Sequence, residues 1–412
     1  MKKRLGMSAV AVVGLVSGAA HAVEPLKLGV SGNMKQWFGV VNQTTSGAPY
    51  TSAQATATGG RDYANTGLAS DTEVYFKAST TLDNGLEIEA RVEIDIVDKG
   101  NGAANSTPQN VAVDEEWASI GSAKYGKVYA GVKESINVSM HNEAPDVGIG
   151  YGDVKEWIHE PSGMVMFGGG AVGGGNDWDF TSFEALIDDS ASISYITPQF
   201  YGLQLGVSFA PNGQGNTGGA GTIGPANRAY HQSDAWDATL AYTREFNGVT
   251  FGADAGIGGA QGSTSGQSGL TSTANVWNAG MKIGYAGFTL GGAFLGYNDD
   301  LSTRSTSGAL SLDGNSWNAG LSYENGPWAV STMFYHEEHR GSIGTGDNKI
   351  ITSQKAEKFN TYLLSGKYTL GPGIDAKATG FYGEYLGRNY AAANTNYNTK
   401  GTGLVTGIDL TF

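Results

Sequence analysis

The sequence contains no cysteine, only 10 prolines among 412 residues, and few basic side chains. A chain without cysteine cannot rely on disulfide bonds for its stability. Lysine and arginine number 25 against 39 aspartate and glutamate residues, so the formal net charge is -14. Because a surface that binds phosphate groups must be basic, this charge argues against nucleic acid as a partner.

The sequence also lacks a long apolar run, apart from one at its start. Residues 5–20 are apolar or small, follow three basic residues, and precede the small-x-small triplet Ala20-His21-Ala22. This order is typical of a secretory signal peptide, and the run is short for a membrane span of about 20 residues. We therefore predict a signal peptide at 1–22 and an exported domain at 23–412; an uncleaved anchor is the alternative. Removing three cations takes the net charge from -14 to -17.

Alternating hydrophobicity is abundant. Residues 86–96 read LEIEARVEIDI, so one face carries leucine, isoleucine, alanine and valine and the other carries only charged side chains. Successive side chains of a β-strand point to opposite faces, so this period of two predicts a strand with one apolar and one charged face. The preceding Asn84-Gly85 favours a tight hairpin turn, because both positions tolerate positive φ.

The same unit recurs along the chain and predicts sixteen strands. They are expected near 26–40, 72–78, 86–96, 113–121, 127–133, 190–197, 202–210, 235–246, 249–259, 274–285, 288–297, 316–324, 327–337, 359–370, 374–386 and 402–412. Tight turns alternate with long polar loops near 42–70, 98–112, 134–189, 211–233, 260–272, 299–314, 339–357 and 388–401. This alternation is typical of an outer-membrane barrel, and an even strand number lets the first and last strands pair. The sequence thus predicts an all-β, sixteen-stranded antiparallel transmembrane β-barrel.

Aromatic residues support the membrane interpretation. They fall near strand ends in register with the apolar faces, where amphipathic rings suit the membrane–water boundary. The residues in question are Phe38, Trp236, Trp277, Trp317 and Trp328. Aromatic residues in the core of a soluble β-sandwich are the alternative.

The order of these features resembles the Gram-negative general porin family. It is carried by the signal peptide, the TLDNGLEIEARVEIDI hairpin, GKVYAGV at 126–132, the long loop after the fifth strand, and the terminal Phe412. The resemblance implies a homotrimer in the outer membrane, in contact with lipid and lipopolysaccharide, that passes small polar solutes. It also implies an inward-folded third loop as a constriction, and Phe412 as the assembly signal for the outer-membrane insertion machinery. The loop at 134–189 matches in position but lacks the PEFGG-like segment of enterobacterial porins, so the chain is closer to alpha- and betaproteobacterial porins.

Charged residues predict the chemistry of the pore. On strands whose apolar faces point to lipid, Lys35, Lys77 and Arg91 point inward at similar mid-heights, and Lys367 and Lys377 lie somewhat lower. The loop would face them with acidic residues, which are Glu143, Asp146, Asp153, Glu156 and Glu160. Our hypothesis is a transverse field that orients dipolar solutes, with a weak cation preference from the net acidity. The alternative is that these charges only solvate a polar lumen.

A calcium site is a weaker hypothesis. Asp177 and Asp179 supply hard oxygen ligands at alternate positions beside Asn176. The calcium-loop pattern with its glycine and terminal glutamate is absent, which favours a solvated acidic loop. No cofactor is therefore required by the sequence, and calcium is the one candidate.

No motif in the sequence indicates catalysis. His336-Glu337-Glu338-His339 is not the HExxH pattern of zinc enzymes, and no GxSxG nucleophile motif is found. We predict a channel rather than an enzyme. The alternatives are a substrate-selective channel whose Tyr151 and Trp157 line a binding track, an outer-membrane barrel enzyme, and a secreted adhesin or structural β-protein.

Overall fold

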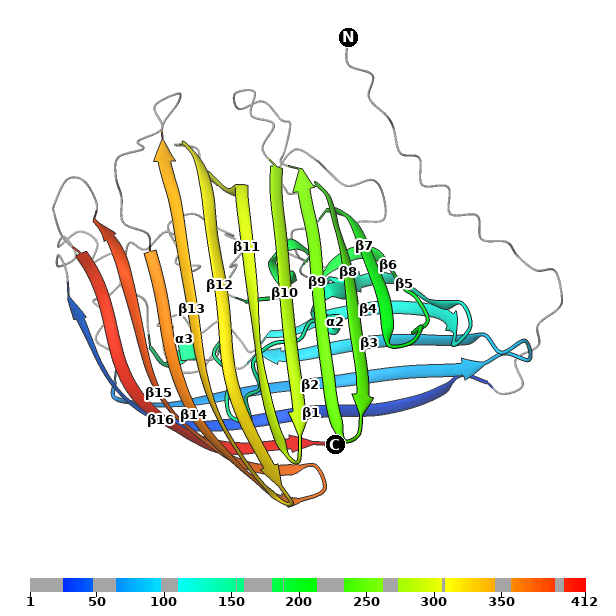
Figure 1. The fold of residues 1–412 in the computed structure, drawn as a ribbon, viewed down its shortest axis with the longest axis horizontal. Helices are drawn as coiled ribbons and strands as arrows, with labels where there is room; N and C mark the ends of the chain where they lie inside the picture. Colours follow the sequence, from blue (N-terminus) through cyan, green and yellow to red (C-terminus); the bar gives the residue numbers. More distant parts are fainter. Residues whose placement is uncertain are drawn as a thin grey trace, which may run out of the picture.

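The protein is a single closed antiparallel β-barrel of sixteen strands, in which each strand pairs with its neighbours in the chain and β16 pairs with β1 (Figure 1). This computed structural model describes residues 25–46, 64–97, 110–152, 154–158, 180–187, 189–212, 233–261, 273–305, 308–344, 357–389 and 396–412. The predicted fold class is confirmed; the predicted signal peptide at 1–22 lies outside the described residues. The strands are β1 Lys27–Ser46, β2 Thr66–Thr81, β3 Glu87–Val97, β4 Asn110–Ser122, β5 Gly126–Lys133, β6 Ser190–Ile196, β7 Leu203–Asn212, β8 Ser233–Phe246, β9 Val249–Gln261, β10 Thr273–Tyr285, β11 Phe288–Ser305, β12 Gly308–Asn325, β13 Trp328–Gly344, β14 Glu357–Gly371, β15 Ile374–Asn389 and β16 Asn396–Thr411.

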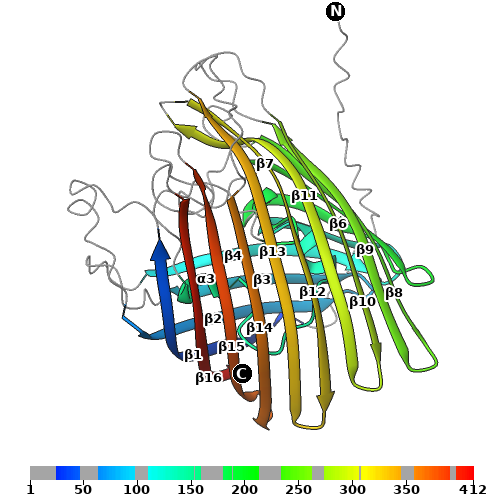
Figure 2. The same cartoon turned by 60° about the vertical axis from the view of Figure 1, so that its left-hand side comes forward.

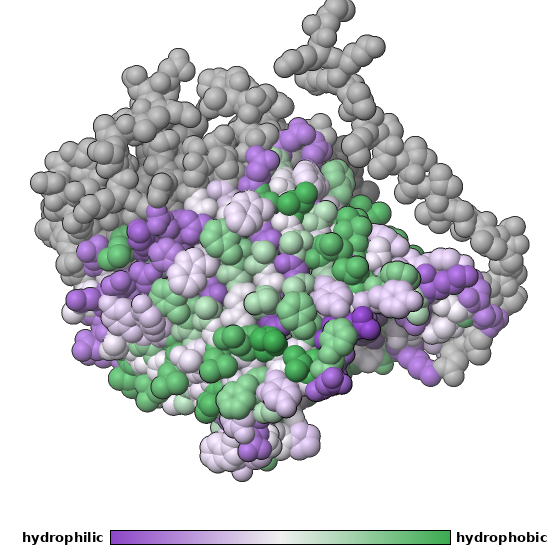
Figure 3. Space-filling view, viewed as in Figure 1, coloured by the Kyte–Doolittle hydropathy of each residue, from purple (hydrophilic) through white to green (hydrophobic). Residues whose placement is uncertain are grey.

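Alternation along each strand gives the barrel an apolar outer face and an inner face rich in polar groups. On β14, Phe359, Thr361 and Leu363 are at most 2 % exposed and point inward, whereas Tyr362 and Leu364 are 54 % and 68 % exposed and point outward. Figure 3 shows apolar residues gathered in a broad band across the visible outer face. An apolar band on the outside of a closed barrel matches a membrane-spanning barrel, in which every backbone group is paired within the sheet.

The tight turns gather at one end of the barrel, together with the carboxy terminus (Figures 1 and 2). The turn between β8 and β9 has Asn247 at φ 50° and Gly248 at φ 79°, which is the left-handed conformation that its Asn-Gly sequence favours. In outer-membrane barrels the short turns lie on the periplasmic side. Strand β1 runs from this end of the barrel towards the opposite end.

The strands are strongly tilted, as the register shows. A path from Ser46 on β1 to the opposite residue on each successive strand passes Asn398 on β16 and reaches Thr80 on β2. Thr80 follows Ser79, the partner of Lys27, so the path returns to β1 at Leu26, twenty residues from Ser46. A sixteen-stranded barrel with this shift has strands tilted by roughly 40°.

The prediction of a long loop at 299–314 is wrong. Strand β11 continues to Ser305 and β12 begins at Gly308, so the two form a hairpin that extends well past the expected strand ends. Most side chains of this segment are polar on both faces, so it lacks the apolar alternation from which strands were predicted. Backbone pairing with the neighbouring strand holds it in the sheet instead.

Short helical segments follow β5. They are α2 Ile136–Met140, α3 Val154–Trp157 and the 3₁₀ turn η1 Glu184–Leu186. In the part of the chain that the structure describes, no helix is both long and apolar enough to cross a membrane.

Candidate functional site

The segment after β5 enters the barrel and attaches to its inner wall at once. Ser135 caps helix α2 by accepting a hydrogen bond from the Asn137 backbone N–H at 3.1 Å. The Ser135 hydroxyl also donates to Asp237 on β8 at 2.9 Å, and the Ile136 backbone N–H donates to Ser208 on β7 at 2.9 Å. The start of the loop is therefore bound to two wall strands.

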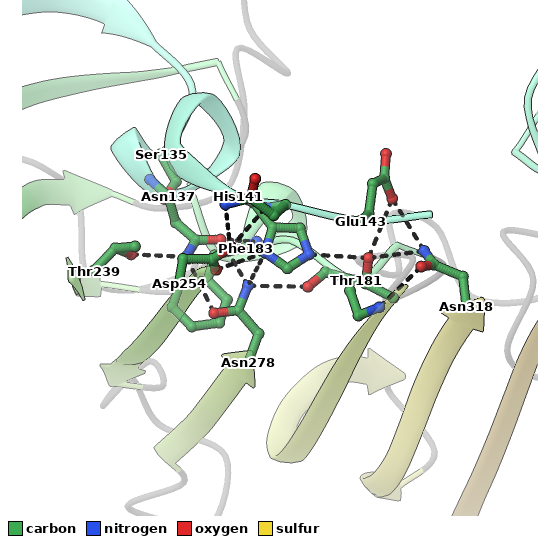
Figure 4. Close-up of polar contacts among 12 residues, drawn as sticks. Ser135, Asn137, His141, Glu143, Thr181, Phe183, Thr239, Asp254, Asn278 and Asn318 are labelled. Atoms are coloured by element: carbon green, nitrogen blue, oxygen red, sulfur yellow. Dashed lines mark hydrogen bonds and ion pairs between the residues drawn. The ribbon is translucent and has the colours of Figure 1, made fainter. Parts of the chain in front are cut away.

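A buried polar network then joins the two described limbs of the loop to the wall (Figure 4). Nδ1 of His141 lies 2.9 Å from Oδ2 of Asp254 on β9, and its Nε2 lies 3.1 Å from the Thr181 hydroxyl on the returning limb. The side chains of His141 and Asp254 are only 3 % and 0 % exposed. Asp254 also accepts the Asn142 backbone N–H at 2.7 Å. His141 thus connects the outgoing limb, the returning limb and the wall.

A second connection is made by two amides. Asn137 accepts the Phe183 backbone N–H at 3.0 Å and donates to the side-chain oxygen of Asn278 on β10 at 3.2 Å. Asn278 in turn donates to the Thr181 carbonyl at 3.0 Å. Because every one of these groups is buried, breaking one contact leaves a polar atom without a partner.

Two predicted loop acids are held against the wall. Glu143 accepts hydrogen bonds from the Tyr151 hydroxyl at 2.9 Å and from Asn318 on β12 at 3.1 Å. Asp146 accepts from Ser331 on β13 at 2.6 Å and from the Gly150 backbone N–H at 2.8 Å. The structure therefore places both acids within the barrel. Asp153, Glu160, Asp177, Asp179 and the side chain of Glu156 lie outside the described residues.

The far end of the described outgoing limb reaches strands β1 and β2. The ring of Trp157 packs directly over Gly39 and Gly67, so closely that a side chain at Gly39 would overlap it. Tyr151 stacks on Tyr335 of β13 with ring centroids 4.3 Å apart. Tyr151 and Trp157 are 6 % and 8 % exposed. The structure therefore does not support a substrate-binding track along these two rings, because both rings are buried against the wall.

Glycines on the inner wall make room for this segment. A Cβ at Gly252 would lie 2.7 Å from the Asn142 side chain, and one at Gly256 would lie 2.6 Å from that of Asn137. At Gly291 it would lie 2.8 Å from the Glu143 carbonyl. Each of these distances is shorter than a normal van der Waals contact, so only glycine lets the loop lie flat on the wall.

The predicted basic residues point inward, and four of them are paired with acids on the same wall. Lys35 bonds to Asp71 at 2.6 Å, Lys77 to Glu89 at 3.0 Å, and Lys377 to Asp409 at 2.7 Å. Arg91 pairs with Glu93, and its guanidinium lies 4.4 Å above the ring of Tyr75. Lys367 lies directly opposite Lys377 on the adjacent strand.

These cations are not all at one level. Lys77 lies directly opposite Arg91, as expected. Lys77 also lies opposite Gly29 of β1, whereas Lys35 lies opposite Asp71, so even with the tilt of the strands Lys77 lies several residues nearer the tight-turn end than Lys35. The expectation of a similar height for Lys35 and Lys77 is therefore wrong, because the distance of a residue from its turn does not determine how neighbouring strands are shifted along one another.

Sequence reasoning missed a charged group at the end of β5. The Lys133 ammonium lies 3.1 Å from the carboxylate of Glu115 on β4 and 3.8 Å from that of Glu134. Lys133 and Glu115 are both buried. Burial raises the pKa of Glu134 to about 7, although the nearby Lys133 opposes the shift. Lys127 also lies 3.7 Å from Glu89. Alternation in GKVYAGVK could have indicated Lys127 and Lys133, because both share the inward face of Tyr129.

The described residues contain no candidate metal-binding site. No group of three or more His, Asp or Glu side chains in these segments has the geometry to hold an ion. The predicted calcium ligands Asp177 and Asp179 lie outside them, so that hypothesis stays a prediction.

A closed sixteen-stranded barrel with an apolar outside and a charged inside defines the class of outer-membrane barrel channels. Residues 9–390 match the family model described as Gram-negative porin, and the chain belongs to this family. Its location is the outer membrane of a Gram-negative bacterium. No curated protein matches the chain.

Solved structures with the same fold cover nearly all of the chain. The anion-selective porin from Comamonas acidovorans matches with a TM-score of 0.54 and 14 % identity, over 94 % of this chain and 100 % of that one. OmpT, an outer membrane protein of Vibrio cholerae in its trimer form, matches with a TM-score of 0.55 and 10 % identity over the same shares. At such low identity these similarities establish the fold alone.

Proposed function

We propose that the protein is a channel for passive diffusion of small hydrophilic solutes and ions, with a weak preference for cations. The observation that carries the preference is the inner wall of β2–β5, where carboxylates outnumber cations. The carboxylates are Asp71, Glu73, Glu89, Glu93, Asp95, Asp114 and Glu115, and the cations are Lys77, Arg91, Lys127 and Lys133.

Most hydrogen bonds from the described loop limbs to the wall reach β7 to β15, from Ser208 through Asn318 to Thr379. On the wall of β2–β5 these limbs contact Glu115 through the Glu134 backbone N–H and Gly67 through Trp157. Dense fixed charge on an inner wall orders water and raises the free energy of an apolar solute relative to a polar one. Ion pairs within the wall cancel part of the field, so the expected selectivity is weak.

The loop acids belong to the same proposal. Glu143 and Asp146 lie inside the barrel, and we propose Asp153, Glu156 and Glu160 as further constriction residues on sequence grounds. An anion preference is the second candidate, favoured by the adjacent cations Lys367 and Lys377, of which Lys377 pairs with Asp409.

A catalytic role is not part of this proposal. The buried chain Asp254–His141–Thr181 has the order of groups seen in acid–base–nucleophile triads. Thr181 is 0 % exposed and its hydroxyl also donates to Glu143 at 3.2 Å, so no substrate can reach it. We propose that this chain fixes the loop.

The test is the reversal potential of the purified protein in a planar bilayer under a salt gradient. The proposal expects a mild cation preference that Glu93→Gln weakens and Lys127→Gln strengthens. A preference for anions in the unmodified protein would favour the second candidate. Absence of current from correctly folded protein would contradict both.

A further inference from the structure

A cavity of about 650 Å³ lies at the tight-turn end of the barrel, between the start of β1 and the hairpin of β2 and β3. This volume is in the range of sites that bind small molecules. The turn at 82–85 borders it, where the Gly85 backbone N–H donates to the Leu82 carbonyl at 2.8 Å. The lining side chains that face the lumen are all polar or charged, and they are Lys27, Lys77, Ser79, Thr81, Glu87 and Glu89.

The end of the cavity farther from the turn is cationic. The Lys77 ammonium lies 3.0 Å from the carboxylate of Glu89, and the Lys127 ammonium lies 3.7 Å from the same carboxylate. The Lys77 side chain is 53 % exposed. Because Glu89 keeps Lys127 as a partner, Lys77 can turn towards a bound solute without leaving this carboxylate unpaired.

The end of the cavity next to the turn is anionic. In the described part of the chain, no hydrogen bond or ion pair engages the carboxylates of Asp83 and Glu87. Glu87 lies directly opposite Thr81, and Glu89 lies directly opposite Ser79. Two exposed hydroxyl groups therefore line the wall from the cationic end to the free carboxylates.

The distance between the two ends fits one class of solute. Glu87 and Glu89 are two residues apart on the same face of β3, so the Lys77 ammonium beside Glu89 lies about 7 Å from the level of Glu87. An extended dipeptide carries its ammonium and its carboxylate about 7 Å apart, because each residue spans about 3.5 Å. A single amino acid spans half of this distance and reaches only one end of the cavity.

We propose that this cavity binds short zwitterionic solutes of dipeptide length, with the solute carboxylate on Lys77 and the solute ammonium on Glu87. The hydroxyl groups of Ser79 and Thr81 then lie beside the peptide amide, and a hydroxyl can both donate to and accept from it. Ion pairs as exposed as these are weak, so the solute is released again, as passage through a pore requires. As a statement about the solutes that cross the barrel, the proposal rests on the proposed function, whereas binding itself needs no current.

Saturation-transfer NMR on the detergent-purified protein tests the site, because this method detects weak binding. The probe is L-alanyl-L-alanine, compared with its N-acetyl derivative, which lacks the ammonium, and with its carboxamide, which lacks the carboxylate. Salt at about 0.15 M screens the net charge of the protein. The zwitterion should bind about threefold more tightly than either derivative, since each derivative lacks one exposed ion pair. Equal affinity for the three peptides would overturn the proposal.

Two variants separate the ends of the cavity. Glu87→Gln should abolish the difference between the dipeptide and its N-acetyl derivative and keep the difference from the carboxamide, and Lys77→Gln should do the reverse. Circular dichroism and thermal unfolding confirm that both variants are folded. The matched control is Glu245→Gln, since Glu245 is a lumen-facing carboxylate at the same end of the barrel on β8, outside the cavity. The proposal is overturned if a folded variant loses both differences, if neither variant loses one, or if the control loses one.

Current recordings on the same samples distinguish the failure of this proposal from the failure of the proposed function. Protein that shows the expected peptide selectivity but carries no current would contradict the channel and support the site. Protein that conducts but does not distinguish the three peptides would support the channel and overturn the site.

Discussion

The imidazole of His141 lies 2.9 Å from the carboxylate of Asp254 inside the barrel, and water reaches almost none of either side chain. The pair joins a loop to a strand more than one hundred residues further along the chain. It is the central attachment of the loop, because the same imidazole also contacts Thr181 of the returning limb.

Substitution His141→Ala should lower the free energy of unfolding by about 3 kcal/mol, because it leaves a buried carboxylate with fewer partners. The loosened loop should also increase current noise in the open channel. Urea unfolding in lipid vesicles and single-channel recording measure the two effects. The matched control is His336→Ala, since His336 is on the outer face beside Asn360 and, among the described residues, contacts none of the loop after β5. Equal stability of the two variants would show that the His141 contact does not hold the loop.

Two glycines of β1, Gly39 and Gly29, test whether the Trp157 ring packs on the inner wall. Gly39→Ala should destabilise the protein by about 1–3 kcal/mol, because the new Cβ would overlap the indole ring. Gly29→Ala is the control on the same strand, where a Cβ would meet only the Lys77 carbonyl at an ordinary 3.8 Å. Tryptophan fluorescence and heat-induced unfolding compare the variants. If both alanines are tolerated equally, Trp157 does not pack on Gly39 in solution.

Glu134 should make the channel sensitive to pH near neutrality. Its pKa is raised to about 7, so the side chain is neutral below that pH and charged above it. Cation preference should therefore increase as the pH rises through about 7. Because the folded state holds this proton more tightly than the unfolded state, the same group lowers stability as the pH rises from about 4.5 to about 7. The pH dependence of the reversal potential checks this, and Glu134→Gln should reduce the step. An unchanged step in that variant would assign it to other groups.

The ion pair between Lys35 and Asp71 allows a positive and a negative charge to be removed separately at the same place in the lumen. Asp71→Asn should shift the reversal potential towards anions and Lys35→Gln towards cations, while the double variant should lie near the unmodified protein. High salt should reduce all of these shifts, because solvent-accessible charges are screened. Shifts of the same sign from both single variants would contradict a lumen location for this pair.

The terminal residue closes the barrel. Phe412 exchanges two backbone hydrogen bonds with Gly32 of β1, with N–O distances of 2.8 and 3.0 Å. Deleting Phe412 should slow membrane assembly, because the first and last strands lose their final pair and the insertion machinery loses its proposed signal. Insertion kinetics into vesicles that carry this machinery, compared with vesicles that lack it, separate the two causes. Identical kinetics for the deleted and full-length chains would contradict both.

Much of the barrel follows from short-range pattern. The alternation in 86–96 and the Asn-Gly turns predict strands and hairpins, because a barrel strand has one face in lipid and the other in water. Where a strand leaves the membrane this contrast disappears, and for this reason the sequence beyond Asp299 predicts a loop although β11 and β12 continue there as a hairpin.

The path of the loop could not be predicted in the same way. Its attachments are single residues from distant strands, such as Asp254, Asn318 and Thr379, and nothing in the local sequence marks them. The pairing of the inward cations also depends on register, which a turn count does not determine to within one residue.

The most direct test of the whole account is the current through purified protein in a planar bilayer under a salt gradient. The account predicts stepwise openings, a reversal potential on the cation side, and a shift towards anions when Glu93 is replaced by glutamine. The account would be contradicted by correctly folded barrels that carry no current, or by a reversal potential that does not change when charges on β2–β5 are removed.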